Sequence, residues 1–130
     1  MAKIAFFLEV TLPRDDDLKR PFKKINMPRI AFKMRLFPGF EAEYKKRHDE
    51  LWPELRQLLK EAGISDYSIF LDEATNDLFG VMKAEDAAKL NDLPSTEIMQ
   101  KWWKNNVGIM ETNPDNSPVQ IPLKELFYLP

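Results

Sequence analysis

The sequence of 130 residues contains one histidine, His48, which lies between two aromatic residues at helical spacing. Tyr44, His48 and Trp52 follow one another at four-residue intervals, so on a helix their side chains project from one face. An imidazole with a reference pKa of about 6.5 takes up or releases a proton near neutral pH. The pattern therefore favours either an acid–base site or a partly buried histidine that is bonded to a backbone carbonyl.

Two neighbouring tryptophans, Trp102 and Trp103, form a second aromatic group. Adjacent residues on a helix point about 100° apart, so one of the two indoles is expected to line an edge or a cavity. The pair either fills a gap between helices or forms an aromatic wall suited to the C–H faces of a sugar. With Tyr67 at the start of a strand, one imidazole, tyrosine hydroxyls and indoles together suit proton transfer to and from a neutral polyol, without metal or cofactor.

Composition excludes several other kinds of site. The absence of cysteine rules out disulfides, thiolate metal sites and a cysteine nucleophile, and it fits a cytoplasmic location. A single histidine without HxH or HExxH spacing predicts no metal site. A net charge of -2 without a basic stripe predicts no binding to nucleic acid, and the apolar run Ile4–Leu8 is too short to span a membrane.

The hydrophobic periodicity predicts a strand, a helix, a hairpin, two further helices and a final strand. The expected elements are strand Ile30–Leu36, helix Glu41–Ala62 bent at Pro53 and closed by Gly63, strands Tyr67–Leu71 and Leu78–Met82, short helix Glu85–Leu93, helix Thr96–Met110 capped by Ser95, and strand Leu123–Leu129. This order predicts an α+β fold with a ferredoxin-like split βαβ antiparallel sheet and helices on one face. The other face needs cover, so we expect a two-fold homodimer.

The beginning of the chain differs in character from the rest. A strand-like piece, Ile4–Leu12, is followed by an acidic triplet and a basic, proline-containing segment, which are typical of an exposed linker. We therefore expect residues 1–28 to be an N-terminal extension or arm of unknown role, and residues 29–130 to form the domain.

Five motifs occur in order along this domain. They are YxxxHxxxWPEL at Tyr44–Leu55, a tyrosine at Tyr67, QKWW at Gln100–Trp103, NPDNSP at Asn113–Pro118 and FYLP at Phe127–Pro130. In these motifs the sequence closely resembles the L-rhamnose mutarotase family, over roughly Arg29 to Pro130.

The resemblance implies a dimeric α+β barrel that interconverts the α and β anomers of L-rhamnose without a cofactor, as an isomerase of carbohydrate and rhamnose metabolism. Carried over by residue, it implies that His48 is the proton donor and that Tyr44, Tyr67, Trp102 and Trp103 contact the sugar. Positioned acid–base help of this kind typically accelerates a reaction by about 10² to 10⁴.

Several alternatives stay open at this point. The second acid–base group is Tyr44, Asp49 or Glu54, although Asp49 should point about 100° away from His48. The preference for L-rhamnose over related sugars such as L-fucose, and the choice of the stacking tryptophan, are not decided by the sequence. The competing function is a dimeric α+β barrel domain that binds haem or another small ligand without sugar epimerase activity, with His48 as the axial ligand to haem.

Overall fold

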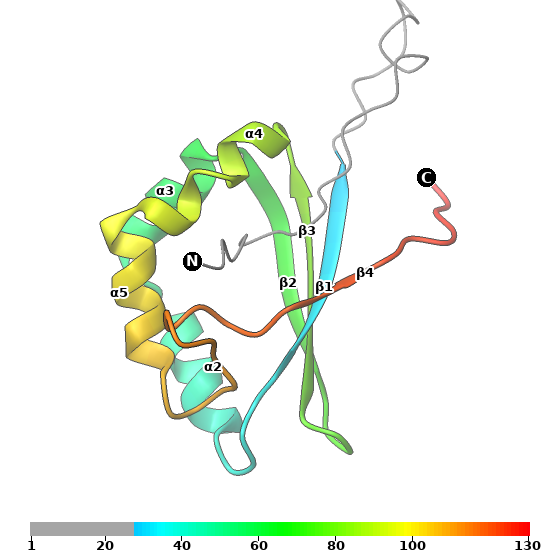
Figure 1. The fold of residues 1–130 in the computed structure, drawn as a ribbon. Coiled ribbons are helices and arrows are strands. Elements are labelled where there is room, and N and C mark those ends of the chain that lie inside the picture. Colours follow the sequence, from blue (N-terminus) through cyan, green and yellow to red (C-terminus); the bar gives the residue numbers. More distant parts are fainter. Residues whose placement is uncertain (1–27) are drawn as a thin grey trace, which may run out of the picture.

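A computed structural model describes residues 28–130 and shows one sheet covered by helices on a single face (Figure 1). The elements are β1 (Arg29–Arg35), α2 (Glu41–Asp49), α3 (Pro53–Glu61), β2 (Ile64–Asp72), β3 (Asp77–Ala84), α4 (Ala87–Leu90), a 3-10 turn (Leu93–Ser95), α5 (Glu97–Asn106) and β4 (Ile121–Leu123). The strand-like piece Ile4–Leu12 and the linker predicted after it lie outside the described residues.

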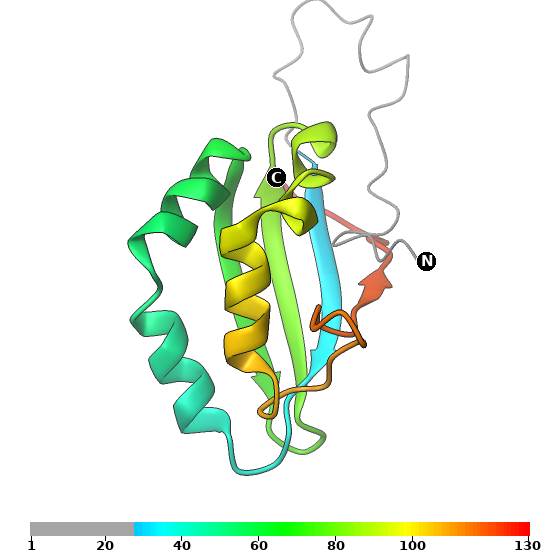
Figure 2. The ribbon, with the colours of Figure 1, turned by 60° about the vertical axis from the view of Figure 1, so that its left-hand side comes forward.

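The four strands stand in the order β2-β3-β1-β4, and each neighbouring pair is antiparallel. In this order the two strands that flank the first crossover are separated by β3, as expected for a split βαβ unit. Figures 1 and 2 show α2, α3 and α5 on the same face of the sheet. The predicted α+β fold with an antiparallel sheet and helices on one face is therefore confirmed.

The core lies between the sheet and this helical layer. Phe32, Met34 and Leu36 are buried while Arg35 is exposed, which is the predicted alternation along β1. Inward residues of β3, such as Met82, are equally inaccessible. None of the helices between residues 28 and 130 is long and apolar enough to cross a membrane.

The predicted helix Glu41–Ala62 is wrong in one respect, because it is broken rather than bent. Helix α2 ends at Asp49 and α3 begins at Pro53. Proline clashes with a helical residue before it, and Trp52 accordingly has an extended backbone with φ -57° and ψ 132°. Pro53 then serves as the first residue of a new helix, where its missing N–H costs nothing. Gly63, with φ +82°, closes α3 as predicted.

Helix α5 differs from the prediction at both ends. The side chain of Thr96, not that of Ser95, caps its N-terminus by accepting from the N–H of Met99. The Ser95 hydroxyl instead donates to the carbonyl of Asp92 in the preceding turn. The helix ends at Asn106 rather than Met110, because Val107 has an extended backbone with φ -61° and ψ 134°, and Gly108 follows with φ +95°.

The last strand is also shorter than predicted and lies earlier, at Ile121–Leu123 instead of Leu123–Leu129. Residues 124–130 form no regular structure. Beyond Leu123, side chains link this segment to the first residue of β1. Glu125 pairs with Arg29 at 3.1 Å, and the Arg29 guanidinium lies 3.4 Å from the centre of the Tyr128 ring. The predicted helix Glu85–Leu93 is shortened likewise to α4, whose N-cap is Asp86.

A close contact between β3 and β1 gives a test of this packing. Gly80 pairs with Phe32, and a Cβ on Gly80 would lie 2.5 Å from the Phe32 ring. We expect Gly80→Ala to lower the free energy of unfolding by about 1 to 3 kcal/mol, because the buried ring cannot move away freely. Urea denaturation followed by tryptophan fluorescence measures the change.

The matched control is the same substitution in a Phe32→Leu background, where the clash is relieved. Gly80→Ala should then cost clearly less than in the wild type. Equal costs in the two backgrounds would show that the ring is not what constrains Gly80.

Candidate active site

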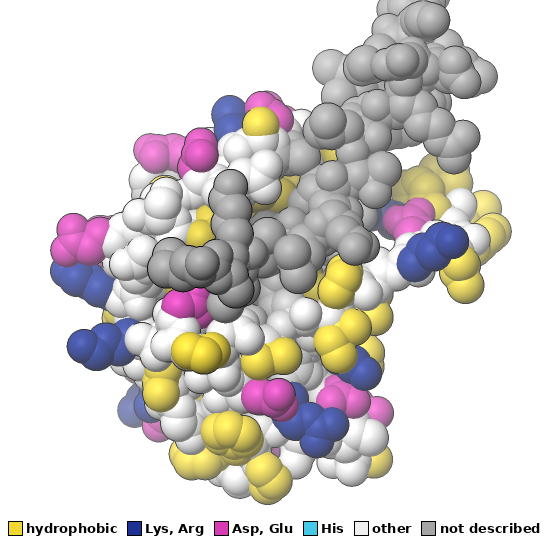
Figure 3. Space-filling view, in the orientation of Figure 1, with side chains coloured by type: hydrophobic (Ala, Val, Ile, Leu, Met, Phe, Trp, Pro, Cys, Tyr) yellow, Lys and Arg dark blue, Asp and Glu magenta, His cyan; other side chains and the backbone are white. Residues whose placement is uncertain are grey.

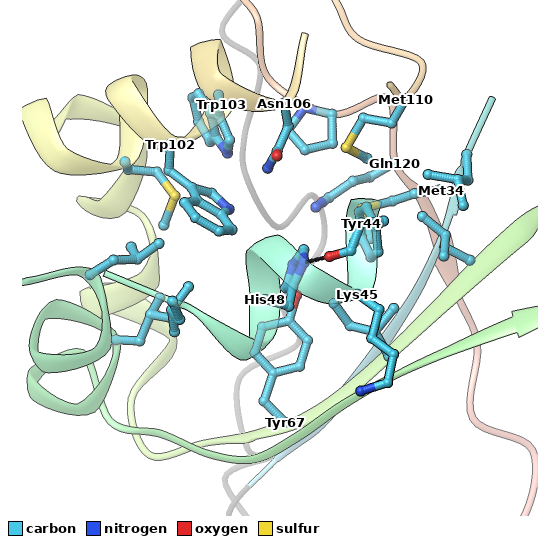
Figure 4. Close-up of a pocket in the computed structure, with 18 of the residues that line it drawn as sticks. Met34, Tyr44, Lys45, His48, Tyr67, Trp102, Trp103, Asn106, Met110 and Gln120 are labelled. Carbon is cyan, nitrogen blue, oxygen red and sulfur yellow. Dashed lines mark hydrogen bonds between the residues drawn. The ribbon is translucent and has the colours of Figure 1, made fainter. Parts of the chain in front are cut away.

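A cavity of about 690 Å³ lies between the sheet and the helices, within the size range of small-molecule pockets. His48, Tyr44, Tyr67, Trp102 and Trp103 all line it. Figure 4 shows these side chains converging on one space from two helices and a strand. The structure thus brings together all five residues that the sequence analysis selected, and their roles stay predictions.

Helix α2 provides two of these residues one turn apart. Tyr44 is buried, and its ring centre lies 4.2 Å from that of His48. The imidazole also meets the Trp102 ring edge-on at 5.3 Å. Trp102 in turn contacts Trp52 at 5.2 Å, again edge-on. Because Trp52 leaves the path of α2, it packs on Trp102 and not on the helical face predicted for it.

Strand β2 provides Tyr67 through an irregularity in its pairing. Ser65 pairs with Lys83 and Ser68 with Val81, so β2 contains one extra residue there. Asp66, within this bulge, has a positive φ of 48°. As a result Ile64 and Tyr67 both face the helices. In a regular strand, two residues three positions apart would lie on opposite faces of the sheet. Tyr67 rises from the sheet toward His48 in Figure 4.

The hydrogen bonding of His48 sets which nitrogen is free. Its Nδ1 lies 2.9 Å from the backbone carbonyl oxygen of Tyr44. A carbonyl can only accept, so Nδ1 carries the hydrogen and donates it. In the neutral ring this leaves Nε2 with a lone pair, and no hydrogen bond to Nε2 occurs within residues 28–130. His48 is thus bonded to a backbone carbonyl, as the second interpretation expects. Its Nε2 still has a lone pair that could take part in acid–base chemistry.

Burial shifts the titration of the site's polar groups. It lowers the pKa of His48, against the opposing effects of the Tyr44 carbonyl and of the negative charge of Asp49. Burial raises the pKa of Tyr67, and burial together with the nearby Tyr67 raises the pKa of Tyr44. Near neutral pH the imidazole is therefore mainly uncharged, and both tyrosines keep their hydroxyl hydrogens.

The groups considered for the second acid–base role occupy different positions. Glu54 is exposed on α3 and does not line the cavity. Asp49 lines it, but its carboxylate is exposed and pairs with Lys45 at 2.7 Å. Tyr44 remains beside the imidazole. Within the described residues 28–130 no three histidine, aspartate or glutamate side chains gather in a way that could hold a metal ion.

The NPDNSP motif folds as a turn that completes one wall. The Asn113 amide donates to the carbonyls of Ser117 and Pro118, at 3.3 and 3.2 Å. The Asp115 carboxylate accepts from the Ser117 N–H at 3.0 Å. This turn carries Pro118 and the following Gln120 to the cavity.

Asn106 and Gln120 are among the polar residues of the cavity that the sequence analysis does not predict. Asn106 follows Trp102 by four residues and Trp103 by three, so helical spacing places it on their face. That spacing was the available signal. Gln120 lies in a loop, where no periodicity indicates which way a side chain points.

The fold and the cavity define a class, namely an α+β protein with an aromatic-walled pocket built around one imidazole. A family model described as L-rhamnose mutarotase matches residues 29–129. On this match, and on the relatives below, the chain belongs to the L-rhamnose mutarotase family.

Individual relatives are similar over nearly their whole length. The L-rhamnose mutarotase of Bacteroides thetaiotaomicron is 57% identical over 103 residues, which are 79% of this chain and 99% of that protein. That of Mesorhizobium japonicum is 56% identical over 101 residues, or 78% of this chain and 96% of the relative. The crystal structure of the L-rhamnose mutarotase from Formosa agariphila matches with a TM-score of 0.74 at 54% identity, covering 79% of this chain and 99% of that one.

The lowered pKa of His48 can be measured directly, since the sequence has one histidine and its Cε1–H NMR signal has no overlap with another. We expect a pKa below the reference 6.5. The variant Asp49→Asn should lower it further, because the Asp49 charge favours the imidazolium. Glu73→Gln, in the exposed β2-β3 turn, is the control that should leave it unchanged.

The same shift fixes the sign of a stability effect. As the pH falls below about 6.5 the unfolded chain binds the histidine proton before the folded protein does, so the free energy of unfolding decreases until the lowered pKa is reached. Above about 6.5 this group contributes no pH dependence. A measured pKa at or above 6.5 would contradict the burial of the ring.

Proposed function

We propose that this protein is an L-rhamnose mutarotase, an isomerase of rhamnose and carbohydrate metabolism that interconverts the α and β anomers of the sugar. The observation that carries the proposal is the Nε2 of His48, which faces an aromatic-walled cavity and has no hydrogen-bond partner among residues 28–130. Family membership adds support, and it favours this function over a ligand-binding domain without epimerase activity.

In the proposed reaction the Nε2–H of protonated His48 gives its proton to the ring oxygen of the sugar while the C1–O5 bond breaks. The anomeric hydroxyl loses its proton, and C1 becomes an aldehyde carbon. After rotation about C1–C2, the O5 hydroxyl attacks the other face of C1 and returns its proton to Nε2, while the carbonyl oxygen takes back a proton and becomes the anomeric hydroxyl again. Because the pKa of His48 is lowered, its protonated form is a stronger acid than free imidazolium.

The proton of the anomeric hydroxyl needs a second group, and a tyrosine hydroxyl is the available neighbour. Because burial raises the pKa values of Tyr44 and Tyr67, neither hydroxyl is ionised near neutral pH. A hydroxyl can instead accept the sugar proton as it passes its own to water. Such a relay leaves the tyrosine unchanged at the end of each cycle.

The remaining walls suit a neutral sugar. We propose that Trp102 and Trp103 contact its C–H faces, while Tyr44 and Tyr67 bond to its hydroxyls. Trp102 also touches the imidazole at 5.3 Å between ring centres, so it is placed to hold both the acid and the sugar.

We further propose that the protein is a homodimer in which two sheets pack face to face and complete an α+β barrel. The outer face, defined as the side of the sheet away from the helices, carries two rows of directly paired residues. These rows are Phe70, Phe79, Lys33 and Ile121, and Ser68, Val81, Ala31 and Leu123. All but Lys33 and Ser68 are apolar, and Phe70 is 60% exposed.

The C-terminal segment extends this apolar surface. Leu126, Phe127 and Leu129 are each more than three-quarters exposed. Figure 1 shows the segment leaving β4 on the side away from the helices, and Figure 3 shows its hydrophobic side chains at the right edge of the molecule. A second copy related by a two-fold axis offers the same apolar rows in return, which is why it fits this face.

Two further expectations belong to the proposal. Residues 29–130 are taken as the mutarotase domain and residues 1–28 as an N-terminal extension, in line with the match to residues 29–129. The proposed location is the cytoplasm, which suits a sequence without cysteine.

The function is tested by exchange between the anomers of L-rhamnose at equilibrium, measured by saturation-transfer NMR. The wild type should accelerate exchange, and His48→Ala should lose about 10² to 10⁴ of that acceleration because the positioned acid is gone. Sugar-induced changes in tryptophan fluorescence show whether the variant still binds. If the wild type exchanges the anomers only at the spontaneous rate, L-rhamnose is not the substrate, and other 6-deoxy sugars would be tried next.

The dimer is tested by sedimentation of the wild type and Phe70→Glu. The wild type should have twice the mass of one chain, and the variant that of a single chain, since an unpaired carboxylate buried between two sheets costs about 3 to 5 kcal/mol. Gln57→Glu, on the exposed face of α3, is the control and should remain dimeric. A Phe70→Glu variant that stays dimeric would place the interface elsewhere.

A further inference from the structure

Asn106 is a buried polar residue that the reaction described above does not use. Its side chain is only 4% exposed, and its Oδ1 has no hydrogen-bond partner among the described residues. A buried polar atom without a partner destabilises a folded protein, and native structures rarely keep one without a purpose. Asn106 nevertheless lines the cavity that holds His48.

The backbone around Asn106 fixes its position without using the amide. Asn106 is the last residue of α5, and its carbonyl accepts from the N–H of Ile109 at 3.3 Å. In Figure 4 the amide points into the space between Trp102, Gln120 and His48. The Asn106 side chain therefore faces the cavity, and its Oδ1 has no partner among the described residues. This arrangement leaves the amide available to bond with a group of a bound ligand.

The chemistry of the amide matches a sugar hydroxyl. A primary amide has an acceptor oxygen and a donor NH₂, and a hydroxyl can both donate and accept. A carboxylate or an ammonium group at this depth would need a counter-charge, whereas Asn106 presents none. The part of the cavity at Asn106 is therefore suited to a hydroxyl group of the ligand.

We propose that Asn106 is a specificity-determining residue that pairs with the hydroxyl on C3 or C4 of the sugar. This inference rests on the proposed function, because it takes the sugar with C1 and O5 at His48. A rise of 1.5 Å per residue puts Asn106 about 6 Å along α5 from Trp102, whose ring touches His48. Across the pyranose ring from C1 and O5 lie C4 and C3.

The experiment compares the wild type with Asn106→Leu, which keeps the size of the side chain and removes its amide. We expect kcat/KM for L-rhamnose to fall about tenfold, the effect of losing one hydrogen bond between neutral groups in a buried site. Asn105→Leu is the matched control on the exposed surface of the same helix and should keep the wild-type value. Asn106→Ser, a smaller residue, repeats the test if the leucine disturbs folding.

Monodeoxy sugars identify the hydroxyl. With either the 3-deoxy or the 4-deoxy analogue, kcat/KM of the wild type should fall to the value that Asn106→Leu has with L-rhamnose. The kcat/KM of the variant should not decrease further with that analogue. With the 2-deoxy analogue, wild type and variant should still differ about tenfold. Thermal melting adds a second readout, since replacing an unpaired polar group should maintain or raise Tm.

Two results would overturn the role of Asn106. One is an unchanged kcat/KM in Asn106→Leu, and the other is the same loss with every analogue, which would indicate altered packing. Sugar affinities measured by tryptophan fluorescence separate this inference from the proposed function. A wild type that binds the sugars but does not exchange them refutes the mutarotase while the affinities still test Asn106, and a wild type that binds none of them refutes both.

Discussion

The site depends on one hydrogen bond inside helix α2, from Nδ1–H of His48 to the carbonyl of Tyr44. The bond fixes both the tautomer and the direction of the ring, so that Nε2 is the nitrogen left for a ligand. Because donor and acceptor are one helical turn apart, the helix itself sets their separation. The other site residues lie around this ring. The Tyr44 ring belongs to α2, Trp102 to α5 and Tyr67 to β2.

Proline at position 53 is what lets the helical layer enclose the imidazole. It ends α2 directly after His48 and gives Trp52 an extended backbone, so the indole can turn onto Trp102. In a continuous helix Trp52 would continue the line of Tyr44 and His48 instead of turning away from it. In the sheet, the bulge at Asp66 has a comparable effect on the site, because it places Tyr67 on the face that is directed toward the helices.

Local patterns predicted much of this architecture. Alternation gave β1 and the β2-β3 hairpin, and the order of elements gave the antiparallel sheet, because both follow from burying one face. The five site residues were found through their types and through motifs shared with a family. The break at Pro53 goes beyond the predicted bend, because a proline also disfavours the helical conformation in the residue before it, here Trp52. The bulge and the short β4 depend on pairing between distant segments, which no local pattern contains.

The same burial explains both the reactivity of the site and its unpaired asparagine. Burial among apolar and aromatic side chains lowers the pKa of His48 and raises the pKa values of Tyr44 and Tyr67. In such a buried environment of low dielectric constant, a hydrogen bond to the ligand gains strength. The Asn106 Oδ1 is buried in the same way and has no partner among the described residues, so its cost to the free protein and its value for recognition have one cause. A site that discriminates among neutral sugars by hydroxyl position needs such a group, since apolar walls alone reject an added or missing hydroxyl only weakly.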